Sequence, residues 1–281
     1  MLFGLATVAA AVTAYPEGYL EGYPDASQQG TSSQIKVACV GDSITAGYLA
    51  SSKAKTYPSM LQQMLGNNYS VTNLGHGGTT ALAGGDAPYW ATNHWSMLTS
   101  GRWEHIIVMF GTNDAKVNNW PHEFNDACSH LNLLSCRFAS DYATMLRVMF
   151  HLGKHFGHRP IPKIWLMTPP PLMENGAYNM NQSVINELLP KIIPSFLTDP
   201  DLGAPSIAGH IDIFGALGGR ELGGLSPSGC SVNTSTPSGC KYFCDAQSCD
   251  QCHPNDDGYA LLAKTVYETA FAHHALTTRL R

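Results

Sequence analysis

A serine in the first quarter of the chain has neighbours that suit nucleophilic chemistry. Ser43 follows the apolar, β-branched run 35–40 and Gly41, so it lies where a buried strand would turn into a helix. A serine hydroxyl at such a turn is held in place, and its own backbone N–H can face the same site. Because Gly-Asp-Ser is also a common turn with a good helix cap, this stretch alone leaves both interpretations open.

A candidate base and its orienting acid lie in the last polar stretch before the final predicted helix. The chain there reads Asp250-Gln-Cys-His253. An aspartate three residues before a histidine can curl back within one turn and hydrogen-bond the imidazole. This bond would fix the tautomer and leave the other ring nitrogen facing Ser43, as nucleophilic catalysis by a serine requires.

Two further positions could supply hydrogen-bond donors for the oxyanion that forms after attack. Gly78 offers a backbone N–H with no side chain in the way, and Asn113 offers a side-chain amide. Each follows an apolar run that predicts a strand.

The elements that must position these residues alternate between strands and helices. We predict strands over 35–40, 69–74, 105–110, 163–168 and 210–214, and helices over 57–65, 139–156, 182–193 (bent or ended by Pro190) and from Asn255 or Asp256 to about 273. This alternation indicates a parallel sheet with helices on both faces, a three-layer α/β/α fold. Sites in such sheets lie beyond the carboxyl ends of the strands, so Ser43, Gly78 and Asn113 should meet at one edge.

Composition limits the range of functions. Only 13% of the 281 residues are charged, the net charge is −5, and no Lys/Arg cluster occurs, so nucleic acid is not an expected partner. Surface polarity must come from uncharged side chains, which is typical of secreted proteins. We expect a signal peptide over 1–14, a leader arm over 15–34, one domain over 35–275, no membrane span and a monomer.

Eight cysteines agree with an oxidising compartment. Cys39 should be a buried thiol inside the first strand, and Cys128 should pair with Cys136. Five more lie in the Gly/Ser/Pro-rich loop 215–252, which we expect cysteines rather than a core to order, and their pairing stays open. Asn-x-Ser sequons occur at Asn68, Asn181 and Asn233.

Four blocks of the sequence resemble those of the SGNH (GDSL-type) hydrolase superfamily, in the same order along the chain. They are Gly41-Asp42-Ser43-Ile44-Thr45, Asn73 with Gly78, Gly111-Thr112-Asn113-Asp114, and Asp250-x-x-His253-Pro254. Ile44 replaces the leucine of the family's name, and His76 inside the glycine loop has no evident role.

The resemblance implies a flavodoxin-like fold and a serine esterase that needs no metal or cofactor. With the expected signal peptide, this enzyme would be secreted. Ser43 would be the nucleophile, His253 the general base and then acid, and Asp250 the residue that orients His253. The oxyanion hole would comprise the backbone N–H groups of Ser43 and Gly78 and the amide of Asn113.

Other interpretations compete with an esterase. Cys249-Asp-Gln-Cys252-His253 matches the haem-attachment signature, and Cys244, Cys249, Cys252 and His253 could bind zinc. Residues 41–45 are one residue away from the nucleophile elbow of α/β-hydrolases.

The substrate is open at this stage. We expect O-acetyl groups on carbohydrate, with short-chain lipid or lysophospholipid esters as the alternative. A non-catalytic carbohydrate-binding protein on the same scaffold is a third possibility, in which Trp90, Trp95 and Trp120 would line a cleft for sugar rings.

Overall fold

The computed structural model describes residues 34–121, 128–129, 135–152, 161–198, 207–222, 229–232 and 238–272. The expected signal peptide, all but the last residue of the leader arm and the sequon at Asn233 lie outside the described residues. The signal peptide, the leader arm and the glycosylation of Asn233 therefore stay predictions.

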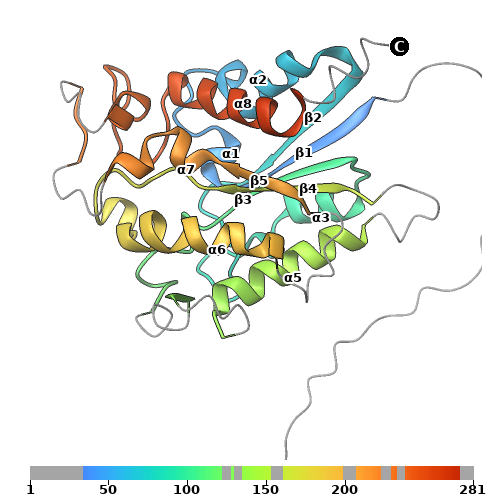
Figure 1. Ribbon diagram of the computed structural model, residues 1–281, viewed down its shortest axis with the longest axis horizontal. Helices are drawn as coiled ribbons and strands as arrows, with labels where there is room; N and C mark the ends of the chain where they lie inside the picture. The colour runs from blue at the N-terminus through green and yellow to red at the C-terminus, as the bar shows by residue number, and fades with distance from the viewer. Residues whose placement is uncertain are drawn as a thin grey trace, which may run out of the picture. The chain divides into compact units, whose positions relative to one another are not determined.

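Five parallel strands form one sheet with the order β2-β1-β3-β4-β5 (Figure 1). The strands are β1 Ile35–Gly41, β2 Tyr69–Gly75, β3 His105–Met109, β4 Lys163–Thr168 and β5 Ile207–Asp212. This order is that of flavodoxin-like folds, so the predicted fold class is confirmed. The chain reverses its direction of travel across the sheet between β1 and β3, and ligands bind at such a point in this architecture.

Alternate residues of each central strand point into two separate cores. In β1, Ala38 and Val40 belong to one core, while Val37 and Cys39 belong to the other. The first core lies under α3 Asn93–Ser100, α5 Arg137–His151 and α6 Leu189–Ser195, and the second under α2 Tyr57–Leu65 and α8 Asp256–Ala270 (Figure 1). Helices therefore cover both faces, as the strand–helix alternation predicts.

Short helical segments complete the described chain. They are α1 Ser43–Ala46, α7 Ile213–Ala216 and the 3₁₀ turns Lys53–Lys55, Gly66–Asn68, Tyr89–Ala91, Ala177–Asn179, Phe196–Thr198, Gly219–Leu222 and Ser238–Tyr242.

Two predicted element boundaries are wrong for identifiable reasons. Strand β5 ends at Asp212 because that side chain accepts a hydrogen bond from the backbone N–H of Gly215 and caps α7. Pro190 does not end a helix, because α6 continues to Ser195. It lies in the first turn of α6, where its missing N–H has no intrahelical partner to lose, and a π-helical turn at Val184–Leu188 precedes it. The helix predicted over 139–156 is α5, and residues 153–160 lie outside the described part.

Three disulfides are present, Cys128–Cys136, Cys230–Cys240 and Cys244–Cys249, and Cys39 and Cys252 are buried thiols. The prediction for Cys128 and Cys136 is confirmed. Disulfides are not the only contacts that order the loop 215–252, because its residues Leu217 and Phe243 are fully buried in the second core.

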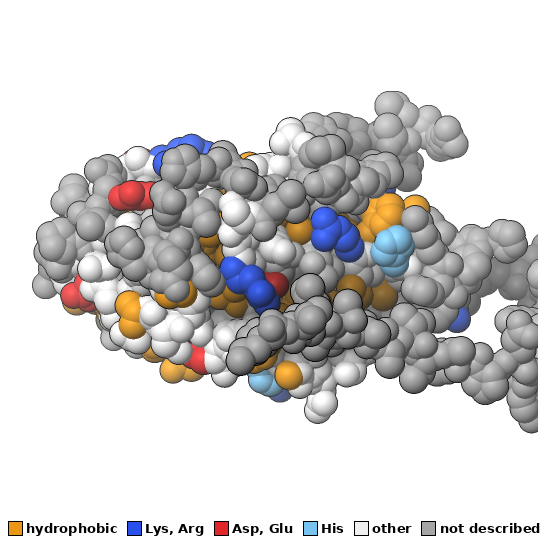
Figure 2. Space-filling model, turned by 90° about the horizontal axis from the view of Figure 1, so that it is seen from below, with side chains coloured by type: hydrophobic (Ala, Val, Ile, Leu, Met, Phe, Trp, Pro, Cys, Tyr) orange, Lys and Arg blue, Asp and Glu red, His pale blue; other side chains and the backbone are white. Residues whose placement is uncertain are grey.

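Among the described residues, no helix combines the length and apolar character needed to cross a bilayer. On the face shown in Figure 2, the described Lys and Arg side chains are scattered among uncharged ones. This distribution fits the low charged fraction of the sequence.

Candidate active site

Ser43 is the first residue of α1, directly beyond the end of β1. Asp42 precedes it as the helix cap, and its Oδ1 accepts a 2.9 Å hydrogen bond from the backbone N–H of Ile44. Burial raises the pKa of Asp42 to about 6, although this hydrogen bond offsets part of the effect. Because Ser43 begins a helix, its own N–H has no intrahelical acceptor and is available to a ligand.

The structure brings the serine and the histidine together across 210 positions of sequence. Ser43 Oγ lies 2.8 Å from His253 Nε2. On the other side of the ring, His253 Nδ1 lies 2.6 Å from Asp250 Oδ2. Asp250 Oδ1 accepts the backbone N–H groups of Cys252 at 3.0 Å and His253 at 2.7 Å, so the turn itself aims the carboxylate.

Asp250 is ionised in this arrangement. Partial burial would raise its pKa, but the hydrogen bond and charge of His253 outweigh that effect and lower the pKa to about 2. The carboxylate can therefore keep the Nδ1–H of His253 in place, leaving Nε2 to exchange a proton with Ser43.

The two remaining donors also reach the site. Gly78 has a φ of +79°, a region that favours glycine, and a Cβ there would meet no atom within 4 Å. Asn113 is 4% exposed, and its Nδ2 is a buried donor without a hydrogen-bond partner among the described residues. An orphaned donor of this kind is costly unless a ligand uses it.

A cavity of about 440 Å³ joins these groups. Its lining residues are Ser43, Tyr48, Gly77, Gly78, Asn113, Lys116, Tyr178, Met180 and His253. The volume is within the usual range for small-molecule sites. Of the predicted catalytic and oxyanion-hole residues, only Asp250 is not in the lining, because it lies behind His253.

Asp114, a residue to which the sequence analysis assigned no role, joins the two segments that carry the proposed oxyanion-hole donors. Its buried carboxylate accepts the backbone N–H of Ala81 at 3.2 Å and of Leu82 at 2.8 Å. These bonds join the segment after β3, which carries Asn113, to the segment after Gly78. Burial raises the pKa of Asp114 to about 7, although both N–H groups favour the charged form.

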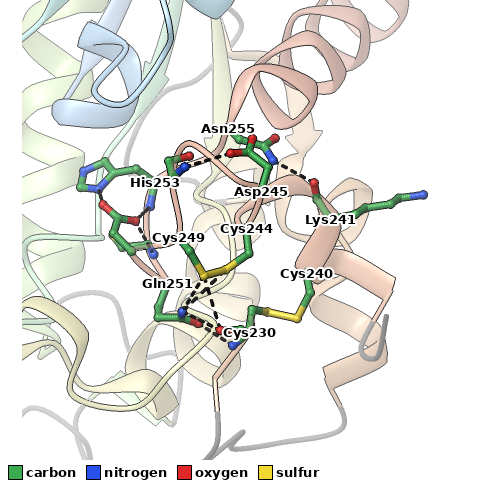
Figure 3. The surroundings of a disulfide bond; sticks show 12 residues. Cys230, Cys240, Lys241, Cys244, Asp245, Cys249, Gln251, His253 and Asn255 are labelled. Atoms are coloured by element: carbon green, nitrogen blue, oxygen red, sulfur yellow. Dashed lines mark hydrogen bonds and ion pairs between the residues drawn. A yellow bond between two sulfur atoms is a disulfide. The ribbon is translucent and has the colours of Figure 1, made fainter. Parts of the chain in front are cut away.

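Gln251, two residues before His253, lies beside the Cys230–Cys240 and Cys244–Cys249 disulfides, as Figure 3 shows. The Gln251 side chain accepts the backbone N–H of Cys230 at 2.6 Å and donates to the Cys230 carbonyl at 2.9 Å. Its Nε2 also lies 3.3 Å from Cys249 Sγ. Because Cys249 is bonded to Cys244 and His253 faces Ser43, this geometry supports neither the haem nor the zinc interpretation.

His76 turns toward a second histidine instead of the Ser43 hydroxyl. Its Nδ1 lies 3.1 Å from His94 Nδ1, and its backbone N–H donates to the Gly41 carbonyl at 2.9 Å. Burial and the charge of His76 lower the pKa of His94. The backbone bond fixes the start of the glycine loop against the end of β1.

The alternative in which three tryptophans line a cleft finds no support at this cavity. Trp120 is 4% exposed and packs on Phe138, while Trp90 donates to the Ala81 carbonyl and packs on Trp95. None of the three lines the cavity, whose aromatic side chains are Tyr48, Tyr178 and the imidazole of His253.

A parallel sheet in the order 2-1-3-4-5, with a Ser–His–Asp hydrogen-bond chain beyond its carboxyl edge, is the arrangement of a serine hydrolase on a flavodoxin-like scaffold. The chain belongs to the GDSL-like lipase/acylhydrolase family, which matches residues 39–261. The family resemblance of the four sequence blocks is thus confirmed.

A known esterase matches part of this sequence. An acetylxylan esterase from Xylanibacter ruminicola is 34% identical over 163 residues, which cover 57% of this chain and 32% of that protein. The match therefore spans about a third of that relative's length.

Solved structures share the fold. A carbohydrate acetylesterase from Sinorhizobium meliloti has a TM-score of 0.55 at 17% identity, covering 85% of this chain and 100% of that one. An aryl esterase from M. smegmatis has a TM-score of 0.53 at 15% identity, covering 83% and 97%.

Proposed function

We propose that this protein removes O-acetyl groups from carbohydrate through an acyl-enzyme on Ser43. The observation that carries the proposal is the 2.8 Å approach of Ser43 Oγ to His253 Nε2 inside a cavity that also holds the unpaired amide of Asn113.

In the acylation step, His253 Nε2 accepts the hydroxyl proton as Ser43 Oγ attacks the ester carbonyl carbon. The carbonyl oxygen becomes an oxyanion that accepts the N–H groups of Ser43 and Gly78 and the Asn113 amide. As the tetrahedral intermediate collapses, the bond to the alcohol oxygen breaks, and His253 gives its proton to that oxygen.

In the deacylation step, water enters the cavity and gives a proton to His253 Nε2 while its oxygen attacks the acyl carbon. The second tetrahedral intermediate expels Ser43 Oγ, which takes the proton back from His253. Acetic acid is released, and the ionised Asp250 stabilises the imidazolium in both steps.

The preference for acetyl groups on carbohydrate draws support from two sources. The matched part of an acetylxylan esterase is 34% identical to this chain. The cavity also exposes aromatic rings at its mouth, because Tyr48 is 52% and Tyr178 48% exposed. Such rings suit the apolar faces of sugars as well as other flat groups.

The proposal includes export from the cell and N-glycosylation. Three disulfides and the small number of charged residues support an extracellular protein. Asn68 is exposed, as a glycosylated asparagine must be, whereas the side chain of Asn181 accepts hydrogen bonds from Ser183.

The test compares p-nitrophenyl acetate, octanoate and palmitate, and then measures acetate release from acetylated xylan. We expect the acetate ester and the xylan to be hydrolysed fastest, and Ser43→Ala to lower kcat/KM by about 10⁴-fold or more. Faster hydrolysis of the palmitate ester than of the acetate ester would support a lipid ester as the substrate instead of carbohydrate. A kcat/KM of Ser43→Ala equal to that of the wild type would contradict the mechanism.

A further inference from the structure

A tyrosine in an unusual backbone conformation lies at the mouth of the cavity. Tyr178 has a φ of +53° and the next residue, Asn179, a φ of +62°. Left-handed backbone is uncommon for a bulky residue, and such strain persists only where surrounding contacts enforce it. Contacts with the surrounding structure must therefore hold Tyr178 and Asn179 in this conformation.

The turn around Tyr178 is pinned to the segment that follows Asn113. The Asn179 carbonyl accepts the backbone N–H of Val117 at 3.0 Å, and the Ala115 carbonyl accepts the N–H of Asn181 at 2.8 Å. These two bonds join the tyrosine's turn to the chain that carries a proposed oxyanion donor. Tyr178 therefore has a fixed position relative to the site.

The side chain of Tyr178 reaches Asp250, the residue proposed to orient His253. Its hydroxyl donates a 2.7 Å hydrogen bond to Asp250 Oδ2, the same oxygen that faces His253 Nδ1. Its ring meets the His253 imidazole edge-on, with centroids 5.3 Å apart and planes at 89°. Burial and the hydrogen bond to Asp250 both raise the pKa of Tyr178, so the phenol stays a donor at neutral pH.

We propose that Tyr178 is a positioning residue for the Asp250–His253 pair, an inference that rests on the proposed function. Its hydroxyl holds Oδ2 toward the imidazole and withdraws charge from that oxygen, while its ring packs edge-on against His253.

The first experiment uses Tyr178→Phe, which deletes the hydroxyl and keeps the ring. Asp250 would retain three of its four donors, so we expect kcat to fall about tenfold and KM to change less than about twofold. The carboxylate charge would concentrate toward the imidazole and hold its proton more tightly. The acidic limb of the kcat/KM profile should then move to higher pH by about 0.5 unit.

The matched control is Tyr267→Phe, on α8 and outside the cavity lining, where the same atom is deleted. We expect its kinetics and pH profile to equal those of the wild type. A melting temperature within about 2 °C of wild type for both variants would separate the kinetic effect from a loss of fold.

A double-mutant cycle with Asp250→Asn shows whether Tyr178 acts through the carboxylate. We expect Tyr178→Phe to change kcat by less than about twofold in the Asp250→Asn background. An unchanged tenfold effect there, or a wild-type kcat and pH profile in the single variant, would overturn the inference. Ser43→Ala is assayed in parallel, because activity that survives this change would refute the proposed function and not the role of Tyr178 specifically.

Discussion

At the scale of single residues, the geometry of Asn113 separates its proposed catalytic role from any structural role. Its Nδ2 is buried and bonds no described group, while its backbone carbonyl accepts Asn119 Nδ2 at 2.9 Å. A change of side chain therefore removes a donor from the cavity and leaves the structural hydrogen bond in place.

We predict that Asn113→Ala lowers kcat by about 10²–10³-fold, the usual loss for one oxyanion donor. The melting temperature should stay close to that of wild type, because no described hydrogen bond of the Nδ2 group is lost. The control is Asn93→Ala, an exposed residue at the start of α3. A wild-type kcat for Asn113→Ala in a folded protein would remove Asn113 from the oxyanion hole.

The residues with local sequence signals could be predicted, and the others could not. Asp250 and His253 lie three positions apart, so the chain between them determines their contact. Tyr178 reaches Asp250 from 72 positions away and only through a left-handed turn. No spacing or composition in that stretch indicates such a conformation.

At the scale of elements, the disulfide loop acts as the mount for the Asp250–His253 turn. Asp250 directly follows Cys249, and the Gln251 backbone adopts a φ of +68° between its contacts to Cys230 and Cys249. The backbone N–H of Met173 also donates to the Gln251 carbonyl at 2.8 Å. A shift of this loop would move Asp250 and His253 together relative to Ser43.

We predict that replacing Cys244 and Cys249 together by serine lowers kcat/KM by up to about 10²-fold, since a misplacement near 1 Å can cost that much. The Cys128–Cys136 disulfide offers a matched control, because it also closes a short loop and neither cysteine lines the cavity. Its double serine variant should lose stability but keep kcat/KM. Equal losses of activity in both variants would contradict a specific role for the loop at 230–252.

Strand positions could be predicted because the β-branched and apolar runs of a buried parallel sheet are distinctive. Boundaries set by side-chain contacts could not. The end of β5 depends on the Asp212 cap, and the start of α6 depends on a π-helical turn before Pro190. Neither feature has a periodic signal.

At the scale of the whole molecule, buried carboxylates couple folding to pH. Asp114 has a pKa of about 7 in the folded protein against an ordinary value of 3.8. Its folded form therefore holds a proton more tightly, so its contribution to stability is fully present below pH 3.8 and is lost as the pH rises through 7. Asp250 has the opposite sign, because its pKa is about 2, and its contribution disappears as the pH falls through that value.

We predict that Asp114→Asn lowers the value obtained when the melting temperature at pH 7.5 is subtracted from that at pH 4.5. The reason is that Asp114 stabilises the folded protein at the lower pH, whereas the substituted side chain does not titrate. Asp257→Asn, at an exposed position in the first turn of α8, serves as the control and should keep the wild-type difference. Thermal unfolding followed by circular dichroism at both pH values gives the measurement. An unchanged difference in Asp114→Asn would show that Asp114 does not titrate in this range.

The overall topology follows from the order of elements, because right-handed crossovers leave few ways to build a parallel sheet. That order places Ser43 and Asn113 beyond β1 and β3, next to each other at the carboxyl edge. The cysteine pairing in the loop 215–252 could not be predicted, since several pairings of its five cysteines satisfy the sequence equally well.

Covalent trapping of Ser43 tests the central claim most directly. The protein is treated with diisopropyl fluorophosphate, and peptide mass spectrometry locates the adduct while residual esterase activity is measured. We predict one adduct on Ser43, a loss of activity in proportion to labelling, and slower labelling of Asp250→Asn. Full ester hydrolysis by protein whose Ser43 is completely modified would contradict the account.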